Sequence, residues 1–259
     1  MSLKIEQLTF SSPEKILFEH LDVEFSYGKL ISVLGANGVG KTTFFKCLLR
    51  ILEATSGTVY LDDKSIEHFS RQEIARKIAY IAQTHTPSFP YRVLDIVLMG
   101  KTPHLHQFYQ TPTEKDEQVA YAILQSLDIE HLAEKNYRRL SGGERQLVMI
   151  AQAMMQDTKI IIMDEPLSSL DFGYQHKIYQ VIKQMTEQGK LIIVSTHQPE
   201  HALTYSDEVL ILEKDCQFHF GAPLEVMTIK VLERIYKIKI SLQEVTDTKG
   251  GKHYVCVTE

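Results

Sequence analysis

The chain has 259 residues, which is enough to bury a full hydrophobic core without disulfides or structural metals. Hydrophobic residues make up 44% and charged residues 24% of the sequence, and this balance excludes a mainly disordered chain. The formal net charge of -5 excludes a broadly basic surface, so no nucleic acid is expected as a partner.

The three cysteines, Cys47, Cys216 and Cys256, are far apart and odd in number, which favours a reducing compartment over a disulfide framework. The N-terminal residues lack the basic and apolar segments of a signal peptide. No uncharged apolar run approaches the roughly 20 residues that span a bilayer. We therefore expect any role at a membrane to depend on a partner protein.

The first part of the chain combines strand patterns with one helix. Two alternating segments, interrupted by Ser11, Ser12 and Pro13, predict an antiparallel entry into a sheet. A short apolar run then ends at a glycine, and helical spacing follows it. We expect strands at residues 3–10, 16–25, 30–34, 58–61 and 78–81, and a helix at about 41–51.

The pattern changes at about residue 87, where helical periods replace buried strand runs until about residue 156. Apolar strand runs then return and alternate with a helix, which indicates a parallel sheet covered on both faces. The tail predicts a hairpin with a turn at Lys249, Gly250 and Gly251. We expect helices at residues 93–99, 114–127, 144–155 and 174–188, strands at 159–163, 191–194 and 209–212, and the hairpin within 238–257.

Residues 35–42 read Gly-Ala-Asn-Gly-Val-Gly-Lys-Thr and match the P-loop pattern, between a predicted strand and a predicted helix. Backbone amides of such a loop surround phosphates, Lys41 reaches the β and γ phosphates, and the Thr42 hydroxyl binds Mg²⁺. The predicted nucleotide-binding residues of this segment are Asn37, Gly38, Val39, Gly40, Lys41, Thr42 and Thr43.

The predicted fold class is α/β: a P-loop NTPase core with a mainly parallel sheet, an N-terminal antiparallel β portion and an inserted helical subdomain. We expect a single domain over residues 1–259. Its core would comprise residues 1–86 and 157–259, and residues 87–156 would form the helical subdomain.

Polar residues follow three of the predicted strands. Asp164 and Glu165 stand where ligands of parallel sheets collect, so one carboxylate is expected to position Mg²⁺ and the other to polarise the attacking water. His197 is expected at the same edge, where it can donate to the γ-phosphate or hold that water. Gln83 can touch the metal and the water from a moving segment. The predicted catalytic residues are Glu165, His197 and Gln83, and the predicted Mg²⁺ ligands are Thr42, Gln83 and Asp164.

The segment Leu140-Ser-Gly-Gly-Glu-Arg-Gln begins a predicted helix. Ser141 and Glu144 have the spacing of a capping box. Gly142 and Gly143 leave the helix start open to close approach by an anion, which the helix dipole favours. By itself, the segment fits a capped helix and an anion site equally well.

Together these motifs resemble the ATP-binding subunit of ABC transporters over nearly the whole chain. The resemblance implies that Lys41 and Thr42 serve as the Walker A residues for ATP and Mg²⁺. It likewise implies that Asp164 is the Walker B magnesium ligand and that Glu165 is the catalytic base of an ATPase.

The resemblance extends to the remaining family loops. Their positions are Gln83 in the Q-loop, Asp171 in the D-loop, His197 in the H-loop and residues 140–146 in the family signature. The family implies a head-to-tail nucleotide-sandwich dimer, in which Ser141, Gly142 and Gly143 of one copy close on ATP held by the other. Because the chain has one P-loop and one signature, a second copy of itself or a relative is an expected partner.

One position departs from the family pattern. Members usually place an aromatic ring near the end of the first strand to stack on adenine, and this position falls near Ser12. Ser12 cannot stack. Phe10, two residues earlier on the same strand face, is the candidate substitute.

Residues 93–105 and 221–228 resemble importers of iron chelates, haem and vitamin B12. This implies a subunit on the cytoplasmic face of the membrane that acts with an integral permease and an extracytoplasmic binding protein. Phe89, Pro90 and Tyr91 are the candidate permease contacts. Importers of molybdate-type oxyanions, zinc or manganese, and soluble non-transport ABC ATPases, remain alternatives. His104 and His106 are a weak metal pattern and are expected in a surface loop.

Overall fold

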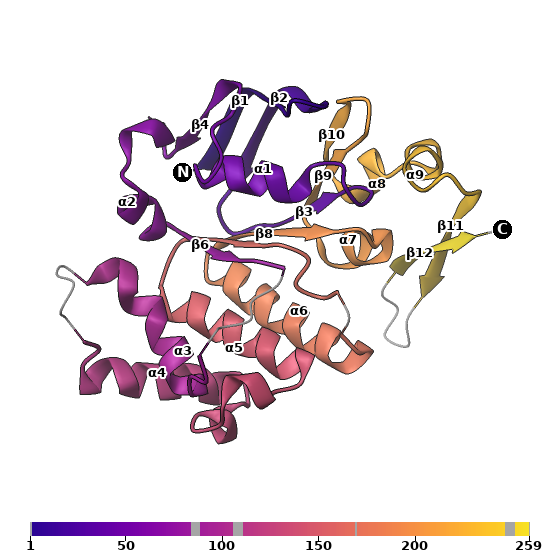
Figure 1. Ribbon diagram of the computed structural model, residues 1–259. Helices are drawn as coiled ribbons and strands as arrows, with labels where there is room; N and C mark the ends of the chain where they lie inside the picture. The colour runs from indigo at the N-terminus through magenta and orange to yellow at the C-terminus, as the bar shows by residue number, and fades with distance from the viewer. Residues whose placement is uncertain (1, 84–88, 106–110, 169, 247–251, 259) are drawn as a thin grey trace. The chain divides into compact units, whose positions relative to one another are not determined.

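The computed structural model describes residues 2–83, 89–105, 111–168, 170–246 and 252–258 (Figure 1). The chain forms two compact units, of which the first comprises Met1–His68 and Leu191–Glu259 and the second comprises Phe69–Lys190. Each unit contains both strands and helices. The first unit therefore combines the two ends of the sequence, and the second is continuous.

An antiparallel sheet opens the first unit. Its strands are β1 (Ser2–Ser11), β2 (Ile16–Ser26), β4 (Ser56–Leu61) and β5 (Lys64–Ser65), in the order β2-β1-β4-β5. The register of β1 against β2 shifts between Ile5 and Leu8, where Gln7 has a positive φ of 50°. Ile5 and Leu8 are three residues apart and would lie on opposite faces of a regular strand. Because of the bulge, both are buried. The predicted antiparallel entry is confirmed.

Strand β3 (Leu30–Leu34) lies inside the parallel part of the first unit. It pairs in parallel with β8 (Leu191–Thr196) and with β9 (Glu208–Leu212), and β10 (Phe218–Gly221) pairs antiparallel with β9. Every residue of β3 and β8 is buried, which is why both strands appear as continuous apolar runs. Helix α1 (Lys41–Leu48) follows β3, so strand, glycine loop and helix stand in the predicted order.

The C-terminal part of the first unit packs onto its parallel strands. Its elements are α7 (Pro199–Tyr205), α8 (Pro223–Val226), α9 (Ile229–Tyr236), β11 (Ile240–Thr246) and β12 (Lys252–Thr258). Figure 1 shows α9 beside the yellow hairpin of β11 and β12. One buried cluster joins Leu34 of β3, Ala202 of α7 and Leu232 of α9. The predicted hairpin is confirmed, and its predicted turn lies outside the described residues.

The second unit contains a parallel strand pair and most of the long helices. Strand β6 (Ile78–Ile81) pairs with β7 (Ile160–Met163), and Ile81 is opposite Met163. The helices are α2 (Arg71–Ala75), α3 (Val93–Leu98), α4 (Glu114–Ser126), α5 (Gly142–Met155) and α6 (Phe172–Glu187), with 3₁₀ turns at Met99–His104, Glu130–Leu132 and Tyr137–Arg139. The long helices predicted from apolar periodicity are confirmed, with ends that differ by one or two residues.

The predicted helical subdomain over residues 87–156 falls inside the second unit, which also includes β6, β7 and α6. The separate assignment of residues 1–86 and 157–259 to a core stays a prediction. The short helices α2, α7, α8 and α9 were not expected, because an apolar period over one or two turns is hard to distinguish from a loop pattern.

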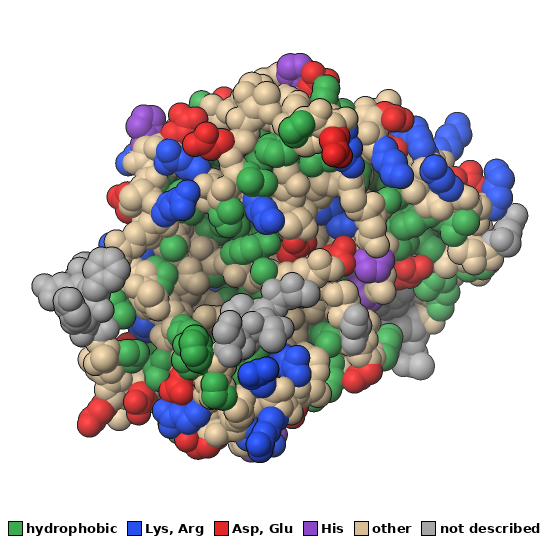
Figure 2. All heavy atoms as spheres, viewed as in Figure 1, with side chains coloured by type: hydrophobic (Ala, Val, Ile, Leu, Met, Phe, Trp, Pro, Cys, Tyr) green, Lys and Arg blue, Asp and Glu red, His purple; other side chains and the backbone are tan. Residues whose placement is uncertain are grey.

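Surface composition agrees with the modest net charge. On the face shown in Figure 2, Lys and Arg side chains are interspersed with Asp and Glu side chains. Among the helices in the described part of the chain, none has the length and apolar character needed to cross a bilayer.

A substitution at Gly100, in the 3₁₀ turn after α3, tests the packing of the second unit. A β-carbon added there would overlap the backbone oxygen of Gln152 and lie 3.0 Å from the β-carbon of Met155, both on α5. We expect Gly100→Ala to lower the free energy of unfolding by about 1–3 kcal/mol, because α5 would have to shift. Denaturant unfolding measures this change. The control Gly142→Ala would meet only Leu170 Cδ2 at 3.7 Å and should leave stability nearly unchanged. Equal effects of both variants would contradict the packing argument.

Candidate nucleotide-binding and catalytic site

The P-loop backbone of the first unit depends on its glycines. Gly38 and Gly40 have φ values of 76° and 117°, in the left-handed region that glycine adopts without steric cost. At Gly35, an added β-carbon would meet the backbone oxygen of Leu212 at 2.7 Å. The first helical hydrogen bond of α1 runs from the Phe44 N–H to the Gly40 oxygen, at 2.8 Å. The amides of residues 41–43 are therefore the helix-start donors that can bind an anion.

Lys41 is held inside this loop. Its side chain is 6% exposed, and its Nζ donates to the backbone oxygen of Gly35 at 2.8 Å. A second lysine, Lys15, donates from Nζ to the backbone oxygen of Gly38 at 3.2 Å. Sequence reasoning missed Lys15, because it comes from the turn between β1 and β2 and belongs to no nucleotide motif. The loop thus has two ammonium groups against its carbonyl oxygens, which suits a phosphate chain.

Ser12, where the family usually has an aromatic ring, and Phe10, the candidate substitute, both lie near the β1–β2 turn. The Ser12 hydroxyl donates to the Lys15 oxygen at 3.0 Å and accepts from the Lys15 N–H at 3.1 Å, so it closes the β1–β2 turn. Phe10 is partly buried, and its ring centroid lies 6.1 Å from that of Phe18. Phe18 in turn packs edge-on against Phe44 of α1. The assignment of Phe10 to adenine stays a prediction.

His197 follows β8 in a short loop that two hydrogen bonds restrain. The Gln198 N–H donates to Thr196 Oγ1 at 3.0 Å, and the Tyr236 hydroxyl donates to the backbone oxygen of His197 at 2.8 Å. Helix α7 then begins with Pro199. In the parallel register, Thr196 is opposite Leu34, so His197 and Gly35 each stand one residue beyond the same pair. The predicted sheet edge therefore brings together the P-loop and the H-loop of the first unit.

In the second unit, Asp164 and Glu165 follow β7 as predicted. Asp164 is 2% exposed, its N–H donates to the Ile81 oxygen at 2.8 Å, and its Oδ2 accepts from the Tyr80 hydroxyl at 3.5 Å. Burial first, and then the Asp164 carboxylate, raise the pKa of Tyr80 to about 12. Tyr80 therefore stays a neutral donor to Asp164 at physiological pH.

Glu165 does not continue the strand. Its φ is 47°, in the left-handed region, and its backbone oxygen accepts from the Ser168 N–H at 3.2 Å and the Ser168 hydroxyl at 2.9 Å. The side-chain direction of Glu165 is therefore set by a turn and not by strand alternation. Gln83 Nε2 donates to Glu165 Oε2 at 3.0 Å. Two of the predicted catalytic residues are thus in direct contact.

The signature segment forms the predicted capping box at the start of α5. The Ser141 N–H donates to Glu144 Oε2 at 2.8 Å, and the Glu144 N–H donates to Ser141 Oγ at 3.3 Å. A β-carbon on Gly143 would overlap the ring of Tyr174 on α6. The Tyr174 N–H in turn donates to Asp171 Oδ1 at 3.0 Å. Tyr174, which no motif indicated, therefore joins the signature to the predicted D-loop residue.

Of the two histidines in the weak metal pattern, the structure describes His104, and this residue has a structural role. His104 Nε2 lies 2.8 Å from the backbone oxygen of Gln156, so this ring caps the end of α5. His106 lies outside the described residues. Within the described ranges, no group of three or more His, Cys, Asp or Glu side chains forms a metal cluster.

The family model described as ABC transporter matches residues 18–168 of the chain. The chain belongs to the ABC transporter family. Members of this family bind and hydrolyse ATP, and the chain is accordingly an ATPase. The expected α/β P-loop architecture is confirmed by its likeness to solved ATP-binding cassettes of ABC transporters.

The similarity to individual relatives covers nearly the whole length of this chain. The chain is 40% identical over 237 residues to an uncharacterized ABC transporter ATP-binding protein of Haemophilus influenzae, covering 92% of this chain and 90% of that protein. It is 33% identical over 258 residues to the iron(3+)-hydroxamate import ATP-binding protein FhuC of Bacillus subtilis, covering 99% and 94%. A metal-chelate type ABC transporter solved in an inward-facing conformation is similar with a TM-score of 0.88 and 30% identity, covering 99% and 97%.

The capping box predicts a pH-dependent stability. The Ser141 N–H, and next the Ser141 side chain, hold the pKa of Glu144 below its ordinary 4.5. A lowered folded-state pKa stabilises the fold above the unfolded pKa, and this stabilisation is lost as pH falls through the folded pKa. Glu144→Ala should therefore be less stable than the parent chain by about 0.5–1 kcal/mol near neutral pH. The difference should shrink below about pH 4.

Denaturant unfolding of both proteins at two pH values measures this difference. Glu144→Gln is the matched control, because glutamine also fills a capping box and does not titrate. Its stability relative to Glu144→Ala should not depend on pH. If the parent chain and Glu144→Ala differ in their free energy of unfolding by the same amount at both pH values, the ionised carboxylate is not the cause of the difference.

Proposed function

We propose that this chain is the ATP-hydrolysing subunit of an ABC importer that takes up a metal chelate of the iron-siderophore, haem or cobalamin class. The FhuC relative and the metal-chelate type transporter support this cargo class. The observation that carries the catalytic assignment is the hydrogen bond between Gln83 and Glu165. It joins the proposed base to the proposed Q-loop residue.

The first unit would bind the phosphates of ATP. Lys41 and the amides at the start of α1 compensate the phosphate charge, and Lys15 is a further cation against the same loop. Asn37 to Thr43 would form this cradle. His197 would donate to the γ-phosphate from the H-loop.

The residues present fit Mg²⁺. Thr42, Gln83 and Asp164 offer a hydroxyl, an amide and a carboxylate, and Mg²⁺ prefers such oxygen donors. Gln83 uses its amide nitrogen for Glu165, so its amide oxygen is the atom left to act as a ligand. Asp164 is a deeply buried carboxylate, for which a cation is a suitable partner. When bound, Mg²⁺ would neutralise charge on the β and γ phosphates.

Glu165 would act as the base that accepts a proton from the attacking water. The hydrogen bond from Gln83 restrains the orientation of the carboxylate, and the bonds from Ser168 fix its backbone. Both restraints reduce the reorganisation needed in the transition state.

The signature would serve the nucleotide of a second copy in a head-to-tail dimer. The Ser141 side chain caps α5 by accepting from the Glu144 N–H, which fixes it at the helix start where it would meet the γ-phosphate. Gly142 and Gly143 leave the amides of α5 accessible. Asp171, which caps α6, would lie at the same dimer surface.

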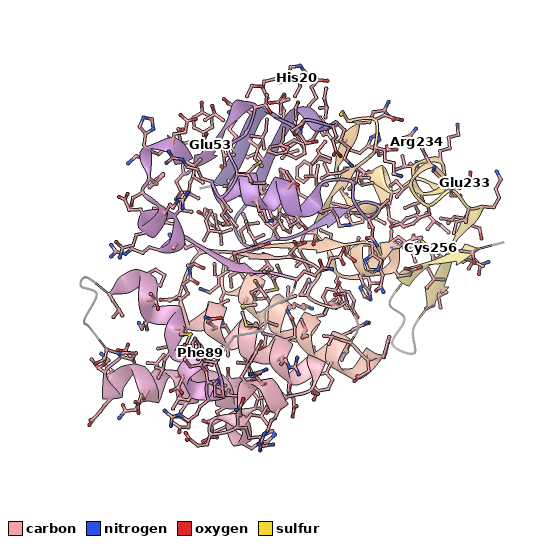
Figure 3. The ribbon with its side chains drawn as sticks, in the orientation of Figure 1. His20, Glu53, Phe89, Glu233, Arg234 and Cys256 are labelled. Carbon is pink, nitrogen blue, oxygen red and sulfur yellow. The ribbon has the colours of Figure 1, made fainter. Side chains whose placement is uncertain are left out.

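The permease is the remaining proposed partner, together with an extracytoplasmic binding protein. Phe89 is 64% exposed and is labelled in Figure 3. Its ring lies 6.1 Å from that of Tyr91, whose backbone oxygen accepts from the Tyr137 N–H. Residues 84–88, between Gln83 and this aromatic pair, lie outside the described residues. An exposed aromatic on a braced backbone suits an anchor for a membrane partner at the cytoplasmic face.

The catalytic role of Glu165 predicts the behaviour of Glu165→Gln. This variant should bind ATP, accumulate as a dimer and lose at least about 100-fold in turnover, because the amide cannot accept the proton. Phosphate release and size-exclusion chromatography with ATP measure these effects. The double variant Glu165→Gln/Ser141→Arg should bind ATP and remain monomeric. Full turnover of Glu165→Gln would show that Glu165 is not the catalytic base. Dimer formation by the double variant would show that Ser141 does not contribute to a head-to-tail dimer interface.

The coupling surface predicts a separate phenotype for Phe89→Ala. Loss of the aromatic anchor should weaken co-purification with the permease encoded by a neighbouring gene by about tenfold or more, while ATP binding survives. Val119→Ala on α4, at 42% exposed, is the control and should co-purify normally. Normal co-purification of Phe89→Ala with the permease would show that the surface around Phe89 is not the permease contact.

Uptake of a labelled iron siderophore, compared with uptake of molybdate, tests the cargo class.

A further inference from the structure

The last turn of α9 contacts the H-loop of the first unit. Tyr236 stands at the end of this helix, and its hydroxyl donates to the backbone oxygen of His197 at 2.8 Å. The two residues are far apart in the sequence, and no motif connects them. The contact therefore exists because the C-terminal segment folds back onto the loop that follows β8.

The ring of Tyr236 is anchored in the core of the C-terminal segment. It packs, with Ile235 and Cys256, against the buried cluster that includes Leu34 and Ala202. Leu34 is the residue before the P-loop, and Ala202 lies in the helix that follows the H-loop. Cys256 is on β12, which packs against α7 (Figure 3). The hydroxyl is thus held by a packed cluster that also contains the strand leading to the P-loop.

Burial keeps this hydroxyl in its donor form. Burial first, and then the charges of Glu200 and Cys256, raise the pKa of Tyr236 well above its ordinary value. A tyrosine that stays neutral can donate to a carbonyl oxygen throughout the physiological pH range. The hydroxyl therefore keeps the proton that it donates to the backbone oxygen of His197 over this pH range.

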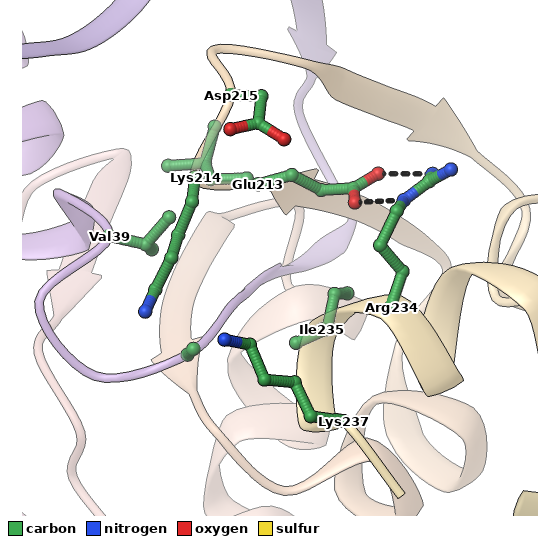
Figure 4. A pocket seen from close by; sticks show the side chains of 9 residues that line it. Val39, Glu213, Lys214, Asp215, Arg234, Ile235 and Lys237 are labelled. Carbon is green, nitrogen blue, oxygen red and sulfur yellow. Dashed lines mark hydrogen bonds and ion pairs between the residues drawn. The ribbon is translucent and has the colours of Figure 1, made fainter. Parts of the chain in front are cut away.

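Arg234, two residues before Tyr236, connects the same helical turn to the end of β9. Its Nε and Nη2 donate to Glu213 Oε2 and Oε1 at 2.5 and 2.6 Å (Figure 4). Glu213 is 7% exposed and also contacts His219 Nε2 at 2.9 Å. It directly follows Leu212, whose backbone oxygen lies against Gly35.

A cleft of about 250 Å³ separates this turn from the P-loop itself. It is lined by Ala36 and Val39 of the loop and by Arg234, Ile235 and Lys237 of the helix end (Figure 4). The Arg234–Glu213 ion pair therefore fixes α9 to the end of β9, beside the start of the P-loop, and not to the loop across the cleft. The last turn of α9 is thus bonded to the loop after β8 through Tyr236 and to the end of β9 through Arg234.

We propose that Tyr236 is a positioning residue for ATP hydrolysis, which holds the backbone of His197, and through it the imidazole, in register with the P-loop. This inference rests on the proposed role of His197 at the γ-phosphate. Tyr236 touches neither substrate nor reacting atoms. Its effect passes through the carbonyl group to which it donates.

Tyr236→Phe tests this role, because it removes the hydroxyl and keeps the ring in the core. In the full-length chain, kcat for ATP hydrolysis should fall about two- to tenfold, the effect of one net hydrogen bond on a rate. The KM for ATP should be unchanged, because the phosphate cradle is intact. Circular dichroism should show a fully folded variant at the assay temperature. The control Tyr254→Phe removes a hydroxyl bond to Glu244 in the same C-terminal segment and should leave kcat unchanged.

A double-mutant cycle with His197→Ala separates positioning from general destabilisation. Single-turnover hydrolysis of labelled ATP measures the slow variants. If Tyr236 acts through His197, adding Tyr236→Phe to His197→Ala should change the rate less than about 1.5-fold. An equal loss in both backgrounds, or a normal kcat for Tyr236→Phe alone, would overturn the proposal. Full activity of His197→Ala would instead refute the proposed role of His197, and the inference with it.

Discussion

Parallel pairing of buried strands is the constraint on which both parts of the site depend. In the first unit, Leu34 is opposite Thr196, so Gly35 and His197 leave the sheet at the same level. In the second unit, Ile81 is opposite Met163, so the residues that follow β6 and β7 leave together. Because parallel strands end at one edge, polar residues that follow them are brought close without any contact being specified in the sequence. The hydrogen bond between Gln83 and Glu165 is the direct result.

Helices α1, α5 and α6 begin in two different ways. Helix α1 begins at Gly40, which has no side chain to occupy the first amides. Helices α5 and α6 begin at Ser141 and Asp171, whose side chains each accept from a backbone N–H of the first turn. An uncapped start leaves its donors to an anion, whereas a capped start is stable without one. Tyr174 then connects the two capped starts, so that the signature and the D-loop residue form one packed unit.

The turn at Glu165 and the loop at His197 share a physical principle. Each residue is held through its backbone carbonyl, by Ser168 in one unit and by Tyr236 in the other. A bond to the carbonyl restrains the main chain without using the functional side chain. Gln83 adds a side-chain restraint, and it also begins the segment that leads to the exposed Phe89.

The amino-acid sequence by itself determined most of the strands, the long helices and the P-loop, because continuous apolar runs, helical periods and glycine spacing are local signals. It also indicated the capping box, whose two residues are three positions apart. It did not indicate the short strands β5 and β10. The contacts of Lys15, Tyr80 and Tyr236 with the site were decided by the tertiary structure alone. Each comes from an element distant in the sequence, and its residue type has no diagnostic spacing. Such contacts arise only when the chain folds back on itself, since a hydrogen bond across many residues depends on the packing of whole elements and not on the local pattern.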